Sequence, residues 1–251
     1  MLLEVRFAMP AYGTHHFAEK VALISDVSSP VGRAVSIQLA LLGSYVVGVD
    51  PKPQPDGAAA MEELVALGTL ARYVAADPGS IAGCRVIADE VLTAFGRLDL
   101  LVNCLKKEPK SSFENETEAE FSFLMRANLG SVKFLIDAVT DLMKDRPGPR
   151  IVNVAWAGVS DPTFSAAQSA IISYSEMAAR TLPKNYRLNC VSVGKKMNET
   201  GSVDAAANTG LRDIAADDVA RAVLFLLSSE SAGMNGQVLR LGHAFPSPGS
   251  A

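Results

Sequence analysis

The sequence has few cysteines, few aromatic residues and no long apolar run. Three cysteines, Cys84, Cys104 and Cys190, occur in 251 residues and form no C-x-x-C pair. An odd, scattered set argues against a disulfide framework and predicts buried thiols in a reducing cytoplasm. No apolar run approaches the roughly 20 residues that span a bilayer, and no signal-peptide pattern is visible at the N-terminus. We therefore expect a cytoplasmic protein that does not cross a membrane.

Charge of either sign is also modest. The chain has 23 Lys and Arg against 27 Asp and Glu, which gives a net charge of −4. This balance provides no basic footprint for nucleic acid or for an anionic membrane. The pair His15–His16 has no third ligand at a suitable spacing, so we predict no metal site and interpret the pair as part of an exposed arm.

Apolar segments of strand length alternate with helical segments along nearly the whole chain. This alternation predicts a single-domain α/β protein with a doubly wound parallel sheet of the Rossmann type. We expect an N-terminal extension at 1–19, the domain at 20–243 and a tail at 244–251. The predicted strands are 20–25, 45–50, 71–76, 98–103, 150–159, 186–194 and 237–241, and the predicted helices are 35–42, 58–67, 81–95, 118–143, 164–182 and 217–228.

The stretch 150–194 contains an apolar strand, R-I-V-N-V-A-W-A-G-V (150–159), then an Ala-rich helical segment and a second apolar strand, Y-R-L-N-C-V-S-V-G (186–194). This combination resembles the catalytic part of the short-chain dehydrogenase/reductase family. That family has a Ser at the end of a strand, Y-x-x-x-K on the next helix and N-x-V-x-P-G after the following strand. Asn153, Asn189, Val191 and Gly194 match the scaffold positions of this pattern. The resemblance extends over about residues 20–243, and it implies a Rossmann fold, a nicotinamide cofactor and an oligomer.

The positions that carry the family's chemistry do not match. Trp156 (or Ala155, in a register shifted by one) replaces the Ser, Phe164 replaces the Tyr and Gln168 replaces the Lys, whereas the family's helix Asn is retained as Asn128. Hydride transfer at an alcohol needs a group that exchanges the hydroxyl proton, and a cation near a Tyr lowers its pKa from about 10. Phenylalanine has no such proton and glutamine has no charge. We therefore predict that this chain has no catalytic residues of its own.

The cofactor loop between the first strand and its helix has also changed. Of the family's T-G-x-x-x-G-x-G pattern only Gly32 remains, because Asp26 and Pro30 occupy the other two glycine positions. Asp26 adds a negative charge near the place of two phosphates, and Pro30 removes a backbone donor. The loop is either purely structural or redesigned to bind an uncharged or cationic ligand.

Two acidic residues at strand ends match positions at which the family contacts its cofactor. Asp50 stands where NAD-dependent relatives bind the ribose hydroxyls, and Asp77 stands where the family contacts adenine. Both residues precede a proline and also fit ordinary strand-to-loop turns. We expect no productive dinucleotide binding by this chain, and we expect NAD in a partner subunit.

Two lysine pairs follow predicted strands. Lys106–Lys107 and Lys195–Lys196 are expected at the carboxyl edge of the sheet, where such folds bind ligands. One hypothesis is that they attract an anionic or CoA-type ligand. The alternative is that they are solvated loop lysines.

The helices 118–143 and 164–182 carry apolar residues on more than one side, which predicts a partner chain. We expect an intact paralogue as that partner, in a hetero-oligomer, most simply a heterotetramer, that works as an NAD-dependent alcohol or hydroxyacyl-CoA dehydrogenase. A homo-oligomeric, ligand-binding regulator is the first alternative. An active oxidoreductase with relocated groups is the second, and its candidate groups are Tyr174, Tyr186, Ser160 and Ser165.

Overall fold

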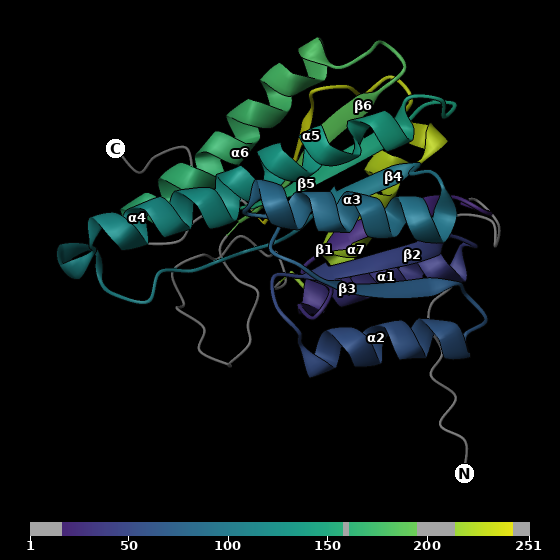
Figure 1. Cartoon of the computed structure of the whole chain (residues 1–251). Coiled ribbons are helices and arrows are strands. Elements are labelled where there is room, and N and C mark those ends of the chain that lie inside the picture. The colour runs from purple at the N-terminus through teal and green to yellow at the C-terminus, as the bar shows by residue number, and fades with distance from the viewer. Residues whose placement is uncertain (1–16, 158–160, 195–213, 243–251) are drawn as a thin grey trace.

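The computed structural model describes residues 17–157, 161–194 and 214–242. These residues form a parallel, seven-stranded sheet with the strand order β3-β2-β1-β4-β5-β6-β7 (Figure 1). The order reverses between β1 and β4, as in a doubly wound sheet, so the predicted fold class is confirmed. The strands are β1 (Val21–Ser25), β2 (Tyr45–Asp50), β3 (Ala71–Ala75), β4 (Leu100–Asn103), β5 (Arg150–Trp156), β6 (Arg187–Val193) and β7 (Val238–Leu241).

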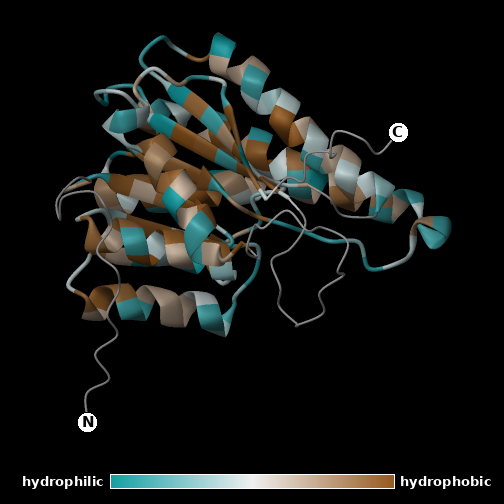
Figure 2. Cartoon of the chain, turned by 180° about the vertical axis from the view of Figure 1, so that it is seen from behind, coloured by the Kyte–Doolittle hydropathy of each residue, from teal (hydrophilic) through white to brown (hydrophobic). Residues whose placement is uncertain are grey.

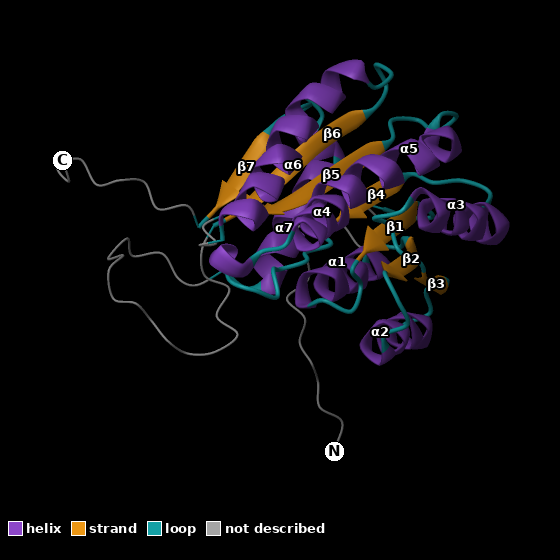
Figure 3. Cartoon of the chain, turned by 60° about the vertical axis from the view of Figure 1, so that its left-hand side comes forward, coloured by secondary structure: helices purple, strands orange, loops and turns teal. Residues whose placement is uncertain are grey.

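Helices cover both faces of the sheet (Figure 3). One face packs against α1 (Pro30–Leu41), α2 (Pro55–Ala66) and α7 (Ala216–Leu227). The other face packs against α3 (Ile81–Phe95), α5 (Ser131–Met143) and α6 (Pro162–Thr181), and α4 (Glu118–Met125) lies against α6.

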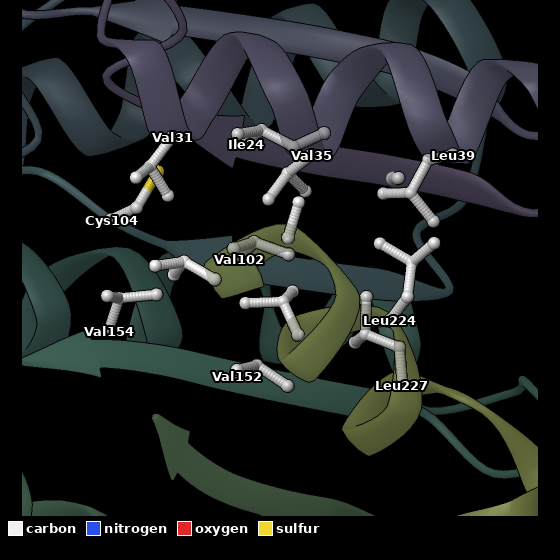
Figure 4. Close-up of a cluster of buried hydrophobic side chains, with 14 of the residues drawn as sticks. Ile24, Val31, Val35, Leu39, Val102, Cys104, Val152, Val154, Leu224 and Leu227 are labelled. Carbon is white, nitrogen blue, oxygen red and sulfur yellow. The ribbon is translucent and has the colours of Figure 1, made fainter. Parts of the chain in front are cut away.

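The central strands are buried on both sides, which is why they are continuous apolar segments rather than alternating ones. All five residues of β1 are buried, and hydrophobic residues are concentrated in the sheet when the chain is coloured by hydropathy (Figure 2). Figure 4 shows side chains of β1, β4 and β5 packed against α1 and α7. Cys104 belongs to this cluster, and the three cysteines are buried free thiols, as predicted.

Prolines open three helices, and this corrects two of the predicted boundaries. Pro30, Pro55 and Pro162 each stand in the first turn of a helix, where the missing N–H has no helical partner to lose. The first helix therefore starts at Pro30 rather than at residue 35. The second helix starts at Pro55 rather than at residue 58.

The predicted long helix 118–143 is interrupted in the structure. A π-helical turn, Arg126–Gly130, separates α4 from α5. Asn128 lies in this turn, and its side-chain amide donates to the carbonyl of Leu124 at 2.9 Å. Such turns concentrate at functional sites, and this one points the Asn128 side chain towards the carboxyl edge of the sheet, where β4 and β5 end.

Candidate functional site

The residues at the family's catalytic positions meet at the carboxyl edge of the sheet. Trp156 ends β5, Phe164 and Gln168 lie in the first two turns of α6, and Asn128 faces them from the π-helical turn. All four side chains are at least nine-tenths buried. The structure therefore brings together the four residues that the sequence pattern named.

Gln168 uses both ends of its amide inside the protein. Its Nε2 donates to Asn128 Oδ1 at 2.9 Å, and its Oε1 accepts the backbone N–H of Trp156 at 3.0 Å. A lysine at this position would offer donors only, and the Trp156 N–H would then lose its acceptor. The local hydrogen bonding is therefore built around an amide and not around an ammonium.

Asn128 is fixed by the backbone of the segment that follows β4. Its Oδ1 accepts the Lys107 N–H at 3.1 Å, and its Nδ2 donates to the Lys107 carbonyl at 2.9 Å. Together with Gln168, these contacts tie α6, the π-helical turn and the β4 loop into one buried network. This arrangement gives Asn128 a scaffold role.

Trp156 and Phe164 replace the hydroxyl-bearing residues with buried rings. Both belong to the same hydrophobic cluster, whereas Ala155 belongs to the cluster beneath α3, α5 and α6. Of the two candidates for the Ser position, Trp156 and not Ala155 therefore lies in the same cluster as Phe164. The ammonium of Lys106 lies 4.8 Å from the centroid of the Trp156 ring system, a cation–π contact that the sequence did not indicate.

The cofactor loop is closed by its own side chains. Ser29 Oγ accepts the Gly32 N–H at 3.1 Å, so a backbone donor of the first turn of α1 is already bonded. The Ser29 hydroxyl donates to the Asp26 carbonyl at 2.7 Å, and Pro30 supplies no N–H. A Cβ on Gly32 would lie 2.2 Å from the Asp26 carbonyl oxygen. Gly32 is thus required by the tight loop itself, whether or not a phosphate binds.

The same local structure occurs a second time, before α3. There, Ser80 Oγ accepts the Gly83 N–H at 3.0 Å and donates to the Asp77 carbonyl at 3.1 Å. A Cβ on Gly83 would lie 2.1 Å from that carbonyl oxygen. The spacing D-x-x-S-x-x-G is shared by residues 26–32 and 77–83, and this signal was available in the sequence. The β1–α1 loop therefore has the form of a capped strand-to-helix junction.

Asp26 differs from Asp77 in its backbone conformation. It has a left-handed φ of 59°, in the place of the family's first glycine. Burial raises the pKa of the Asp26 carboxyl from 3.8 to about 6; nearby Lys107 opposes this shift and Asp50 adds to it. A half-buried carboxylate at this place disfavours a second negative group.

Asp26→Asn is expected to stabilise the chain at high pH. Because the folded-state pKa lies above the unfolded one, the ionised carboxyl costs stability above pH 6, and this cost disappears as the pH falls towards 4. The gain at pH 8 should be about 1–3 kcal/mol, because each pKa unit corresponds to about 1.4 kcal/mol. Thermal unfolding of both proteins from pH 4 to pH 8 measures it. Asp89→Asn on the exposed surface of α3 is the matched control, and an equal gain in both variants would contradict the expectation.

Asp50, which the family resemblance places at a ribose site, is enclosed by its neighbours. It is 0% exposed, its Oδ1 accepts the Ser28 hydroxyl at 2.8 Å, and its Oδ2 accepts the Tyr73 hydroxyl at 2.9 Å. Burial raises the pKa of Tyr73 to about 12, and Asp50 adds to the shift. Gly57 of α2 lies so close that a Cβ there would be 2.1 Å from Asp50 Oδ2. The carboxylate therefore anchors β2, β3 and α2 to one another.

The remaining predicted site residues are dispersed. Asp77 Oδ1 accepts the Gly79 N–H at 2.9 Å, which is turn chemistry. Lys106 pairs with Glu108 at 2.9 Å. His15, His16, Ser160, Lys195 and Lys196 lie outside the described residues.

The tyrosines considered as relocated acids have unfavourable surroundings. Burial raises the pKa of Tyr174 to about 12. Burial also raises the pKa of Tyr186, whose hydroxyl donates to the Thr140 carbonyl at 2.8 Å. These shifts move both hydroxyls away from proton exchange at neutral pH. Ser165 follows the start of α6, and its N–H bonds to the Asp161 carbonyl.

Apolar side chains are exposed on α4 and α6. Phe121 and Phe123 of α4 are 48% and 40% exposed, and Met177 of α6 is 56% exposed. Leu124, by contrast, is fully buried. Helix α4 therefore carries apolar side chains on a solvent-facing side as well as on the side that packs against α6, and α6 exposes Met177.

Two classes of site are absent from residues 17–157, 161–194 and 214–242. These ranges contain no group of three or more His, Cys, Asp or Glu side chains that could hold a metal ion. Among the helices of the same ranges, none is both long enough and apolar enough to span a membrane.

Comparison with known proteins identifies the family. A family model described as Enoyl-(Acyl carrier protein) reductase matches residues 27–241. The glucose and ribitol dehydrogenase homolog 2 of Arabidopsis thaliana is 32% identical over 187 residues, which are 70% of this chain and 64% of that protein. The chain thus spans less than two thirds of that relative. It belongs to the short-chain dehydrogenase/reductase family and groups with oxidoreductases.

Two further matches cover more of the chain. The subunit BbsD of (2S)-[(R)-hydroxy(phenyl)methyl]succinyl-CoA dehydrogenase of Thauera aromatica is 27% identical over 235 residues, which are 88% of this chain and 94% of that subunit. A crystal structure of a short chain dehydrogenase from Mycobacterium smegmatis has a TM-score of 0.81 at 22% identity, with 94% of this chain and 97% of that chain covered. The second match supports the fold alone.

Proposed function

We propose that this chain is a catalytically inactive subunit of an NAD-dependent dehydrogenase and that an intact paralogue supplies the Ser, the Tyr, the Lys and the NAD site. The observation that carries the proposal is the amide of Gln168, whose two ends are bonded to Asn128 and to the Trp156 backbone beside the ring of Phe164. No proton can pass through this arrangement to a substrate oxygen. A positioned acid or base typically contributes roughly 10²–10⁴-fold to rate.

The altered cofactor side supports the same proposal. Asp26 brings a carboxylate to the phosphate position, Ser29 caps the helix that would face the phosphates, and Asp50 is enclosed by Tyr73 and Gly57. Asp26 is a departure from the family's pattern, whereas Ser29 and Asp50 are unavailable because they already bond within the protein. In a Rossmann fold, a dinucleotide uses the backbone donors and the acidic residue at these places. We therefore place NAD in the partner subunit.

A hetero-oligomer gives the exposed helices a role. The apolar residues of α4 and α6 would be covered by the paralogue, in a complex that we propose to be a heterotetramer. One candidate complex is the 2-(hydroxy(phenyl)methyl)succinyl-CoA dehydrogenase of anaerobic toluene degradation, with this chain as its non-catalytic subunit. The similarity to a Thauera aromatica protein that is named as a subunit of such an enzyme supports this candidate.

Co-expression with the intact paralogue tests the proposal. We expect a stable hetero-oligomer that oxidises a hydroxyacyl-CoA with NAD. This chain alone should give no turnover. Its Phe121→Asp variant should fail to assemble with the paralogue and should give no turnover either. Val86→Asp is the control, because Val86 on α3 is 49% exposed and Phe121 is 48% exposed. A homo-oligomer that ignores the paralogue would favour a ligand-binding regulator, and turnover by the lone chain would favour relocated catalytic groups.

A further inference from the structure

The indole N–H of Trp156 is a buried donor without an acceptor. Trp156 is 9% exposed, and its Nε1 has no hydrogen-bond partner within the part of the chain that the structure describes. An indole N–H can only donate, and a buried donor that lost its water without gaining an acceptor is unfavourable. Tryptophan is therefore a costly replacement for a small hydroxyl residue unless something else accepts this hydrogen bond.

The backbone of Trp156 is fixed by hydrogen bonds, so the position from which the indole ring projects is also fixed. Its N–H bonds to Gln168 Oε1 at 3.0 Å, and β5 pairs with β6 up to the register pair Trp156–Val193. The buried network of Gln168 and Asn128 thus fixes the point from which the indole projects. A fixed donor of this kind is the form that binding sites use for one oxygen atom of a ligand.

A cation lies next to the same ring. Lys106 Nζ is 4.8 Å from the Trp156 ring centroid and 2.9 Å from Glu108 Oε1. The Lys106 side chain is 36% exposed and that of Glu108 is 58% exposed, so their ion pair is solvated and contributes little. The ammonium can therefore exchange Glu108 for another carboxylate at small cost.

We propose that Trp156 and Lys106 form a binding subsite for the carboxylate of a small organic acid. One carboxylate oxygen accepts the indole N–H, and the negative charge is balanced by the Lys106 ammonium. A planar carboxylate has two acceptor oxygens, one for the indole at the end of β5 and one for the ammonium on the segment that follows β4. The subsite binds the acid without converting it, because neither Phe164 nor Gln168 can exchange a proton with it. This last point rests on the proposed function, whereas the binding itself does not.

Trp156 is the single tryptophan of the chain, so its fluorescence reports on the subsite directly. Titration of the isolated full chain with succinate should give a saturable change, and the neutral analogue succinamide should give none at the same concentrations. Lys106→Gln should weaken the succinate affinity roughly tenfold, as expected for the loss of one charge-assisted contact. Lys144→Gln removes an exposed lysine near the end of α5 and should leave the affinity unchanged.

A second variant separates the indole N–H from its ring. Trp156→Phe keeps an aromatic surface for Lys106 but lacks the donor, and calorimetry should show a loss of succinate affinity of roughly tenfold. Equal responses to succinate and succinamide, or unchanged affinity in Lys106→Gln, would overturn the subsite and leave a buried water as the acceptor. The titration needs no second chain and no dinucleotide. It can therefore fail while the hetero-oligomer forms, or succeed while the hetero-oligomer does not.

Discussion

Gln168→Lys, which restores the residue of the family, is expected to destabilise the chain and to give no activity. The ammonium would be buried beside the Trp156 N–H, which is itself a donor, and only Asn128 Oδ1 would remain as an acceptor. Leaving the N–H without a partner and burying a charge should lower the free energy of unfolding by about 2–4 kcal/mol. The Tm should fall by roughly 5–15 °C for a domain of this size.

The control for this substitution is Gln237→Lys. Gln237 is exposed and its amide makes one hydrogen bond, to the Asn235 carbonyl at 3.2 Å, so the same change there should leave the Tm nearly unaltered. Thermal unfolding followed by circular dichroism compares the two variants with the parent. A Gln168→Lys protein with the parental Tm would show that the buried network is not built around the amide.

Gly32→Ala is expected to be the most damaging small substitution in the cofactor loop. The new Cβ would lie 2.2 Å from the Asp26 carbonyl oxygen, and the backbone that carries each atom is fixed by the Ser29 cap. Overpacking against backbone should cost about 3 kcal/mol, or roughly 6–12 °C in Tm.

Gly233→Ala is the matched control for Gly32→Ala. No heavy atom lies within 4 Å of a Cβ built on Gly233, so the Tm should stay the same or rise slightly. Both variants can be measured without any ligand, which separates the packing role of Gly32 from phosphate binding. A tolerated Gly32→Ala would mean that the loop is looser than its hydrogen bonds indicate.

The sequence was sufficient for the fold and for the neighbourhood of the catalytic positions. Buried strands such as β1 are continuous apolar runs, and the order of strands and helices defines a doubly wound sheet. Helix starts were less well predicted: the first two helices were expected to begin at residues 35 and 58, although the first turn of a helix accepts proline and both helices begin at one. The π-helical turn at Asn128 has no signal in the hydrophobic periodicity.

Contacts between segments that lie far apart along the chain could not be predicted from the sequence. Nothing in the spacing of Asp50, Gly57 and Tyr73 shows that the three side-chain positions meet, because the contact depends on how α2 lies on β2 and β3. The position of Lys106 over Trp156 depends likewise on adjacent ends of β4 and β5. The repeated D-x-x-S-x-x-G spacing was visible, and it becomes meaningful once both loops are seen to have the same caps.

The number of NAD molecules bound by the complex shows most directly whether this chain is a non-catalytic subunit. Equilibrium dialysis of the purified hetero-oligomer should find one NAD for each paralogue subunit and none for this chain, and the lone chain should retain no NAD at millimolar concentration. The loop around Asp26 and the enclosed Asp50 are the reasons for this expectation. One NAD for every chain in the complex, or saturable binding by the lone chain, would contradict the account.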